Sequence, residues 1–137
     1  MQPRIGQMKT GQKTSNNNLI AIIDDDPVFE RKVSKALMNA GFRVVVITSG
    51  FELLSILSID RPSAIIIDTM LSWIDGLQLV DALRRNPFLS DVRVLFTSRE
   101  KGGRDRRFED FEMVYKPVDI DRLIDRLREM EERDEPA

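Results

Sequence analysis

The chain has 137 residues, 42% hydrophobic and 32% charged, a size and balance that predict one globular domain with a single core. The formal net charge of −2 gives the chain no global basic field to hold nucleic acid, and no apolar run is long enough to span a membrane. Cysteine and histidine are both absent, which excludes disulfides, thiolate and imidazole metal ligands, and histidine-dependent catalysis. The lack of cysteine fits a cytoplasmic location.

The two ends of the chain differ in composition from the segment between them. Residues 1–17 are rich in Gly, Gln, Lys and Asn and show no hydrophobic period, so we expect a flexible N-terminal arm. Residues 134–137 are expected to form a short charged tail. The segment 18–133 is therefore predicted to be the one folded domain.

The first apolar run, residues 19–23, predicts a buried strand that ends in consecutive aspartates from Asp24 to Asp26. A helix is expected to follow, because Asp26 suits an N-cap and Pro27 suits the first helical position. Gly41 is expected to end this helix.

A second strand is expected over residues 44–47, followed by a turn and a short helix. We expect the inner face of this helix to carry Phe51, Leu54 and Leu57, which recur at helical spacing. The sequence Asp-Arg-Pro-Ser at 60–63 is expected to break the helix.

The third apolar run, residues 64–67, leads directly into Asp68 and predicts a strand buried on both faces. Asp68 is then the first residue past the core, at the carboxyl end of the strand, where open α/β sheets bind their ligands. Asp75 and Gly76 open the next helix, which is expected to run to about Arg85.

The last third of the chain predicts two more strands, over residues 92–96 and 111–115, and a final amphipathic helix over 119–132. The intervening segment 99–110 is highly charged, with Phe108 as its one large apolar residue, so we expect a loop or at most two helical turns. The alternation of strands and helices predicts a doubly wound α/β fold with a parallel sheet and a shortened or irregular fourth helix.

The polar residues that follow the strands are expected to meet, because the carboxyl ends of parallel strands share one edge of the sheet. Packed carboxylates raise one another's pKa values unless a cation neutralises them, and oxygen ligands favour Mg²⁺. Beside such a metal, a lysine and a hydroxyl can bind phosphoryl oxygens, and an aspartate can attack phosphorus. The set comprises Asp24, Asp25, Asp68, Thr97, Ser98 and Lys116.

In this order and at these separations, the polar set resembles the receiver domain of bacterial two-component response regulators, which also carries counterparts of Asp75-Gly76 and Lys116-Pro117. The resemblance covers residues 19–132 and implies a flavodoxin-like sheet in strand order 2-1-3-4-5. It implies a sensor histidine kinase or a phosphotransfer protein as phosphoryl donor and a downstream protein as target. It also allows a homodimer through the last helix, while neither nucleic acid nor a membrane is an expected partner of this domain.

The resemblance implies a role for each polar position. Asp68 would accept the phosphoryl group, and Lys116 would pair with it. Ser98, thirty residues after Asp68, would supply the hydroxyl that moves on activation, with Thr97 as the alternative. The remaining implied features are Mg²⁺ ligation by Asp25, Asp68 and the backbone carbonyl of Met70, with Asp24 nearby, often through water, and a cis peptide bond before Pro117.

Three features depart from the family pattern. Ser72 stands where a proline is usual, and Met113 stands where a Tyr or Phe usually rotates with the active-site hydroxyl. The charged segment 99–110 is also shorter than the usual fourth helix. The chemical residues therefore match the family, whereas the residues that transmit phosphorylation differ from it.

Three functions remain as hypotheses. The first is a phosphorylation-dependent signalling receiver, which is no enzyme beyond its own phosphoryl acceptance and slow dephosphorylation. The second is a phosphorylation-independent scaffold with a receiver-like fold, which Met113 and the altered segment 99–110 favour. The third is a Mg²⁺-dependent phosphatase that works through an aspartyl phosphate. Such enzymes often place a second acid two residues after the nucleophile, where this chain has Met70.

Overall fold

The computed structural model describes residues 18–57, 60–99 and 106–133, so the expected arm and tail lie outside the described residues. Within these ranges, strands and helices alternate as the sequence predicts. The strands are β1 (Leu19–Ile23), β2 (Arg43–Ile47), β3 (Ala64–Asp68), β4 (Arg93–Ser98) and β5 (Glu112–Tyr115). The helices are α1 (Pro27–Asn39), α2 (Gly50–Leu57), α3 (Gly76–Arg85) and α4 (Ile120–Arg133), with a short 3-10 helix, η2 (Arg106–Phe108), between β4 and β5.

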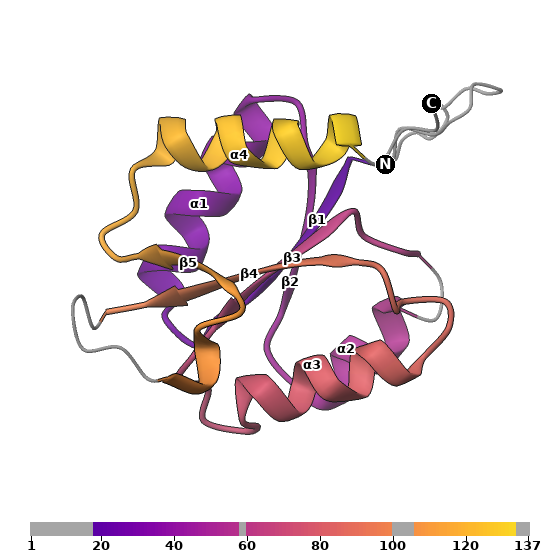
Figure 1. Ribbon diagram of the computed structural model, residues 1–137. Coiled ribbons are helices and arrows are strands. Elements are labelled where there is room, and N and C mark those ends of the chain that lie inside the picture. The colour runs from indigo at the N-terminus through magenta and orange to yellow at the C-terminus, as the bar shows by residue number, and fades with distance from the viewer. Residues whose placement is uncertain (1–17, 58–59, 100–105, 134–137) are drawn as a thin grey trace, which may run out of the picture.

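The five strands form one parallel sheet in the order β2-β1-β3-β4-β5. Figure 1 shows α1 and α4 on one face of this sheet and α2 and α3 on the other. The predicted doubly wound, flavodoxin-like architecture is therefore confirmed.

Short apolar runs explain why the central strands lie inside. All five residues of β1 are buried, and β3 is buried up to Asp68, the residue at which the chain leaves the core. Successive strand residues face opposite sides of the sheet, so a strand covered on both faces must be apolar throughout.

The start and end of α1 follow the predicted signals. The Asp26 carboxylate caps the helix by accepting hydrogen bonds from the backbone N–H groups of Val28 (3.0 Å) and Phe29 (3.3 Å). Gly41 follows the helix with a φ of +100°, a conformation that favours glycine because it has no Cβ. This turn directs the chain back into β2.

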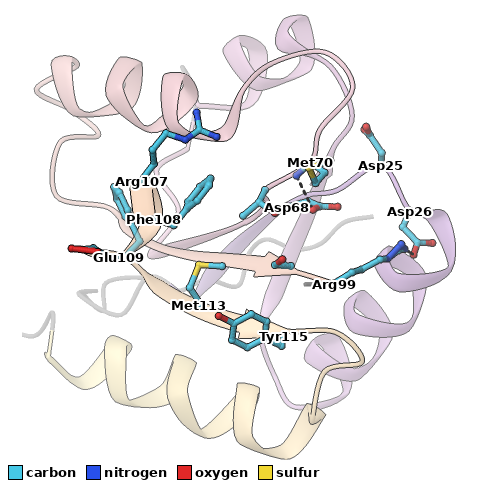
Figure 2. A pocket seen from close by; sticks show the side chains of 13 residues that line it. Asp25, Asp26, Asp68, Met70, Arg99, Arg107, Phe108, Glu109, Met113 and Tyr115 are labelled. Atoms are coloured by element: carbon cyan, nitrogen blue, oxygen red, sulfur yellow. Dashed lines mark hydrogen bonds and ion pairs between the residues drawn. The ribbon is translucent and has the colours of Figure 1, made fainter. Parts of the chain in front are cut away.

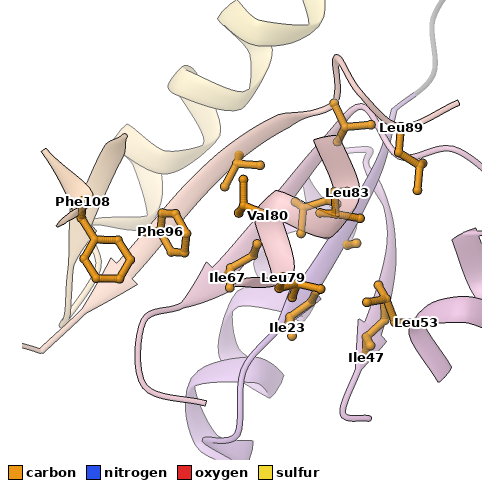
Figure 3. Close-up of a cluster of buried hydrophobic side chains, with 14 residues drawn as sticks. Ile23, Ile47, Leu53, Ile67, Leu79, Val80, Leu83, Leu89, Phe96 and Phe108 are labelled. Atoms are coloured by element: carbon orange, nitrogen blue, oxygen red, sulfur yellow. The ribbon is translucent and has the colours of Figure 1, made fainter. Parts of the chain in front are cut away.

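Two apolar clusters fill the space between the sheet and its helices. On the α1/α4 face, side chains such as Ile22, Leu37 and Leu127 pack together. On the α2/α3 face, Ile67, Phe96 and their neighbours form the second cluster, which Figure 3 shows from close by. Each cluster combines one set of alternating strand residues with the inner stripes of the helices above it.

The prediction for the inner face of α2 is wrong. Phe51 and Leu54 are 81% and 73% exposed, whereas Leu53 is only 7% exposed and Ile56 packs partly buried against the α2/α3 cluster. The helix is so rich in apolar residues that two stripes were available, and the sequence pattern did not distinguish them. The side chain of Leu57 lies outside the described set.

The described part of the connection between β4 and β5 agrees with the predicted shortened or irregular fourth helix. The described part of this connection contains only η2, whose Phe108 is buried. The Phe96 ring meets the ring of Phe108 at a centroid distance of 4.9 Å and that of Phe111 at 5.2 Å, both edge-on. Aromatic contacts therefore cover part of the sheet here.

None of the helices in the described ranges is long and apolar enough to cross a membrane.

Candidate functional site

The carboxyl ends of β1, β3, β4 and β5 lie at one edge of the sheet because these strands are parallel neighbours. Asp68 pairs in register with Thr97, and Ser98 pairs with Tyr115. The Lys116 N–H donates a hydrogen bond of 2.8 Å to the Ser98 carbonyl, which holds the end of β5 beside β4. The polar residues that the sequence places after different strands are therefore brought together.

Lys116 lies between two of the predicted carboxylates. Its Nζ is 3.0 Å from Oδ2 of Asp24 and 3.3 Å from Oδ2 of Asp68. The Lys116 and Asp24 side chains are almost fully buried, while that of Asp68 retains 13% exposure. The ammonium group also lies 4.3 Å from the centre of the Phe29 ring, and the peptide bond from Lys116 to Pro117 is cis, as the resemblance implied.

Burial raises the pKa of the Asp24 carboxyl above its ordinary value. The Asp26 N–H, which donates a hydrogen bond of 2.8 Å to Asp24 Oδ1, and the ammonium of Lys116 lower this pKa, while the negative charge of Asp68 raises it. The predicted rise in pKa is thus present at Asp24, although burial contributes more to it than repulsion.

Asp25 and Asp68 are both held by backbone N–H groups of the loop after β3. Oδ1 of Asp68 accepts a hydrogen bond of 3.0 Å from Met70 N–H, and Oδ2 of Asp25 accepts one of 2.6 Å from Ser72 N–H. Figure 2 shows the exposed Asp25 side chain directed away from Asp68. The two carboxylates therefore have separate partners in this structure.

Ser98 and Thr97 face opposite sides of the sheet. Ser98 lines the same hollow as Asp68, whereas the Thr97 side chain is 1% exposed and its hydroxyl has no hydrogen-bond partner among the described residues. Of the two predicted hydroxyls, Ser98 is therefore the one that lies beside Asp68 in the hollow.

The hollow at this edge of the sheet has a volume of about 870 Å³. Figure 2 shows how it extends from Asp25 and Asp68 toward β5 and η2. Its far end is mainly apolar and aromatic, lined by Phe108, Phe111, Met113 and Tyr115. Asp68 thus faces a space that is open to an approaching group.

The sequence of this protein matches the profile of the response regulator receiver domain over residues 20–128. The chain belongs to this family. Among curated relatives, response regulator MprA of Mycobacterium tuberculosis is 29% identical over 122 residues, which cover 85% of this chain and 52% of MprA. The chain therefore spans about half the length of the curated relatives that it matches.

Solved receiver structures share the fold of this domain. A CheY-like receiver domain from Methylobacillus flagellatus is 26% identical, with a TM-score of 0.70 over 83% of this chain and 98% of that one. The receiver domain of the Francisella response regulator 1452 is 22% identical, with a TM-score of 0.74 over 87% of this chain and 100% of that one.

Arg99, which directly follows Ser98, is a charged residue at the site of this receiver domain that the sequence pattern did not indicate. Its guanidinium is 2.7 Å from Oδ2 of Asp26, and this hydrogen bond holds the pKa of the Asp26 carboxyl below its usual range. Nothing in the local pattern marks Arg99, because its partner at the start of α1 is 73 residues away in the sequence.

The residues at which this receiver domain departs from the family pattern lie in different parts of the site. Met113 and Tyr115 both line the hollow, because alternate residues of β5 face the same side. Ser72 lies in the loop after β3 and provides the N–H that binds Asp25. A proline at this position would have no N–H to donate.

The residues of the receiver site fit Mg²⁺ by their donor chemistry. Within the described ranges, no group of three or more Asp, Glu, His or Cys residues is arranged to hold a metal ion. Mg²⁺ usually needs only one or two carboxylates, and it keeps several waters as further ligands. The carboxylates of Asp25 and Asp68 and the backbone carbonyl of Met70 would supply such an oxygen set.

Proposed function

We propose that this receiver domain accepts a phosphoryl group on Asp68 from the phosphohistidine of a sensor histidine kinase or a phosphotransfer protein. The observation that carries the proposal is the position of Asp68, whose carboxylate contacts Lys116 on one side and faces the open hollow with Ser98 on the other. A cytoplasmic location fits a donor of this kind.

In the proposed transfer, a carboxylate oxygen of Asp68 attacks the phosphorus, and the bond between phosphorus and the donor imidazole breaks. The imidazole leaves and takes up a proton. Lys116 is already within 3.3 Å of Asp68 and would bind a phosphoryl oxygen as charge develops there. The Ser98 hydroxyl would donate a hydrogen bond to another oxygen.

A bound Mg²⁺ would neutralise phosphoryl charge in this reaction. Asp25, Asp68 and the Met70 carbonyl would hold it, with Asp24 close by. We propose that the domain does not act as a general phosphatase. Such enzymes often carry an acid two residues after the nucleophile, where this chain has the apolar Met70, which is 77% exposed.

Intact-mass measurement after incubation with Mg²⁺ and acetyl phosphate tests this proposal. We expect a mass increase of one phosphoryl group in the wild type and none in Asp68→Asn, with Asp81→Asn, an exposed carboxylate on α3, as the matched control. A phosphohistidine-loaded donor protein provides the second arm, since some receivers take phosphate only from a protein. Adduct formation that persists in Asp68→Asn, or that fails with both donor types, would contradict the proposal.

A scaffold that works without phosphorylation is the second candidate, favoured by the reduction of the β4–β5 connection to η2 in the described residues. A downstream protein partner is expected in both cases. Partner affinity that is equal for wild type and Asp68→Asn, with and without the beryllofluoride mimic, would support the scaffold.

A homodimer through α4 remains a further prediction, which sedimentation measurements of the protein in solution would test.

A further inference from the structure

The hydrogen bond between Ser72 and Asp25 links two loops that are 47 residues apart in the sequence. The donor is the Ser72 backbone N–H in the β3–α3 loop, and the acceptor is Asp25 Oδ2 in the β1–α1 loop, at 2.6 Å. A short bond between an N–H and a carboxylate is stronger than one between neutral groups. The bond therefore fixes the direction of the Asp25 side chain.

This direction does not suit a shared metal ion. Figure 2 shows Asp25 directed away from Asp68, and Asp68 is bound to Lys116 and to Met70 N–H instead. To share a cation with Asp68, the Asp25 carboxylate has to turn back toward the sheet edge. That movement breaks or lengthens the bond to Ser72.

We propose that the Ser72 N–H competes with Mg²⁺ for Asp25, which makes Ser72 a positioning residue that lowers the metal affinity of the site. This inference rests on the proposed function in one respect, the assignment of Asp25 as a magnesium ligand. Without the metal, the bond ties the β3–α3 loop to the start of α1. With the metal bound, the loop is released.

Trp73 carries the effect of this release to α2. The indole ring packs at Gly50, the first residue of α2, where a Cβ atom would lie 3.6 Å from Trp73 Cζ3. The indole Nε1 is buried and has no hydrogen-bond partner among the described residues. Trp73 directly follows Ser72 and is the one tryptophan of the chain, so we expect its fluorescence to report a change at Ser72.

Magnesium titration of metal-free protein, followed by Trp73 fluorescence, tests the competition. Ser72→Pro removes the N–H and is expected to bind Mg²⁺ about tenfold more tightly, the fold-change that loss of one such competing hydrogen bond would give. Ser72→Ala keeps the backbone N–H and is expected to match the wild type. Asp25→Asn is expected to bind weakly in both the wild-type and the Ser72→Pro backgrounds.

A measurement on the wild type avoids any effect of proline on loop folding. In ¹⁵N-labelled protein, the Ser72 amide proton should move upfield as Mg²⁺ is added, with the same midpoint as the Trp73 signal. A static Ser72 amide, or equal or weaker Mg²⁺ binding by a folded Ser72→Pro, would overturn the competition while leaving the magnesium site intact. Absence of Mg²⁺ binding in the wild type and in every variant would instead overturn the metal assignment together with the competition.

Discussion

The two faces of the sheet are filled in different ways. The α1/α4 face encloses charge as well as apolar side chains, because Asp24 and Lys116 are buried there beside the Phe29 ring. The α2/α3 face is apolar in its interior, but its helices leave Phe51 and Leu54 exposed, and the described part of the β4–β5 connection contains only η2.

The difference in what the two faces enclose follows from the elements that cover each face of the sheet. The two longest helices, α1 and α4, seal the first face, so an ion pair there is withdrawn from water and its electrostatic interactions become stronger. On the second face, the rings of Phe108 and Phe111 pack edge-on against Phe96 of β4. Buried charge thus lies under the two long helices, and aromatic packing lies beside η2.

The largest expected effect is at Phe96 on the α2/α3 face. Phe96→Ala should lower the free energy of unfolding by about 4 kcal/mol, because it removes a fully buried ring and both edge-on contacts. Urea denaturation followed by circular dichroism measures this. The control Phe88→Ala, at a ring that is 52% exposed, should change stability by less than about 0.5 kcal/mol. Equal losses in the two variants would contradict the proposed role of the aromatic cluster.

Two neighbouring leucines on α2 give the second comparison. Leu53→Ala should lower the free energy of unfolding by about 3 kcal/mol, since Leu53 is buried in the α2/α3 cluster. Leu54→Ala should change it by less than about 0.5 kcal/mol, because Leu54 is largely exposed. The same denaturation measurement applies. A larger loss for Leu54 would mean that α2 is rotated from the position described above.

On the α1/α4 face, Asp24→Asn should raise the free energy of unfolding at pH 7 in metal-free protein. The folded state raises the pKa of Asp24, so this carboxyl destabilises the fold increasingly as pH rises from its ordinary value through its folded value. The asparagine carries no charge, and Lys116 still has Asp68 as a partner.

Denaturation at pH 4 and pH 7 with a chelator present checks this sign. The advantage of the asparagine variant should be small at pH 4 and larger at pH 7. An advantage that stays constant, or that grows toward low pH, would show that burial does not dominate the energetics of Asp24.

The smallest expected effect concerns the buried hydroxyl of Thr97. Thr97→Val should raise the free energy of unfolding by about 0.5 kcal/mol, because it replaces a buried hydroxyl that has no hydrogen-bond partner among the described residues by a methyl group of similar size. Thr97→Ser, which keeps the hydroxyl and loses the methyl, should instead destabilise the protein. Calorimetric midpoints of the two variants would check this, and a destabilising Thr97→Val would indicate a bound water at the hydroxyl.

The sequence was sufficient for the strands and for the meeting of Asp24, Asp68 and Lys116, because buried parallel strands leave their polar ends at a common edge. It misassigned the inner face of α2, where apolar residues occupy two stripes and only packing selects between them. The spacing of apolar residues does not identify the inner face of a short helix that carries apolar residues on two sides.

Two features of the site could not be predicted from the sequence for a different reason. The bond from Ser72 N–H to Asp25 uses a backbone group, which every residue except proline has, so no side chain signals it. The pairing of Arg99 with Asp26 depends on how two distant loops meet. Both follow from tertiary geometry and not from local pattern.

The alignment of β4 has a consequence for insertions and deletions. Thr97 and Ser98 are adjacent, yet one hydroxyl is enclosed by the core and the other faces the hollow. Gain of one residue within β4 before Thr97 would move the threonine into the place of Ser98 beside the hollow, whereas loss of one residue would move Ser98 into the enclosed place of Thr97. Either change would also turn the apolar residues of β4 to the opposite faces of the sheet. Insertions or deletions in the connection before β4 leave this arrangement unchanged and should be tolerated. An insertion or deletion within β4 should instead change which hydroxyl faces Asp68.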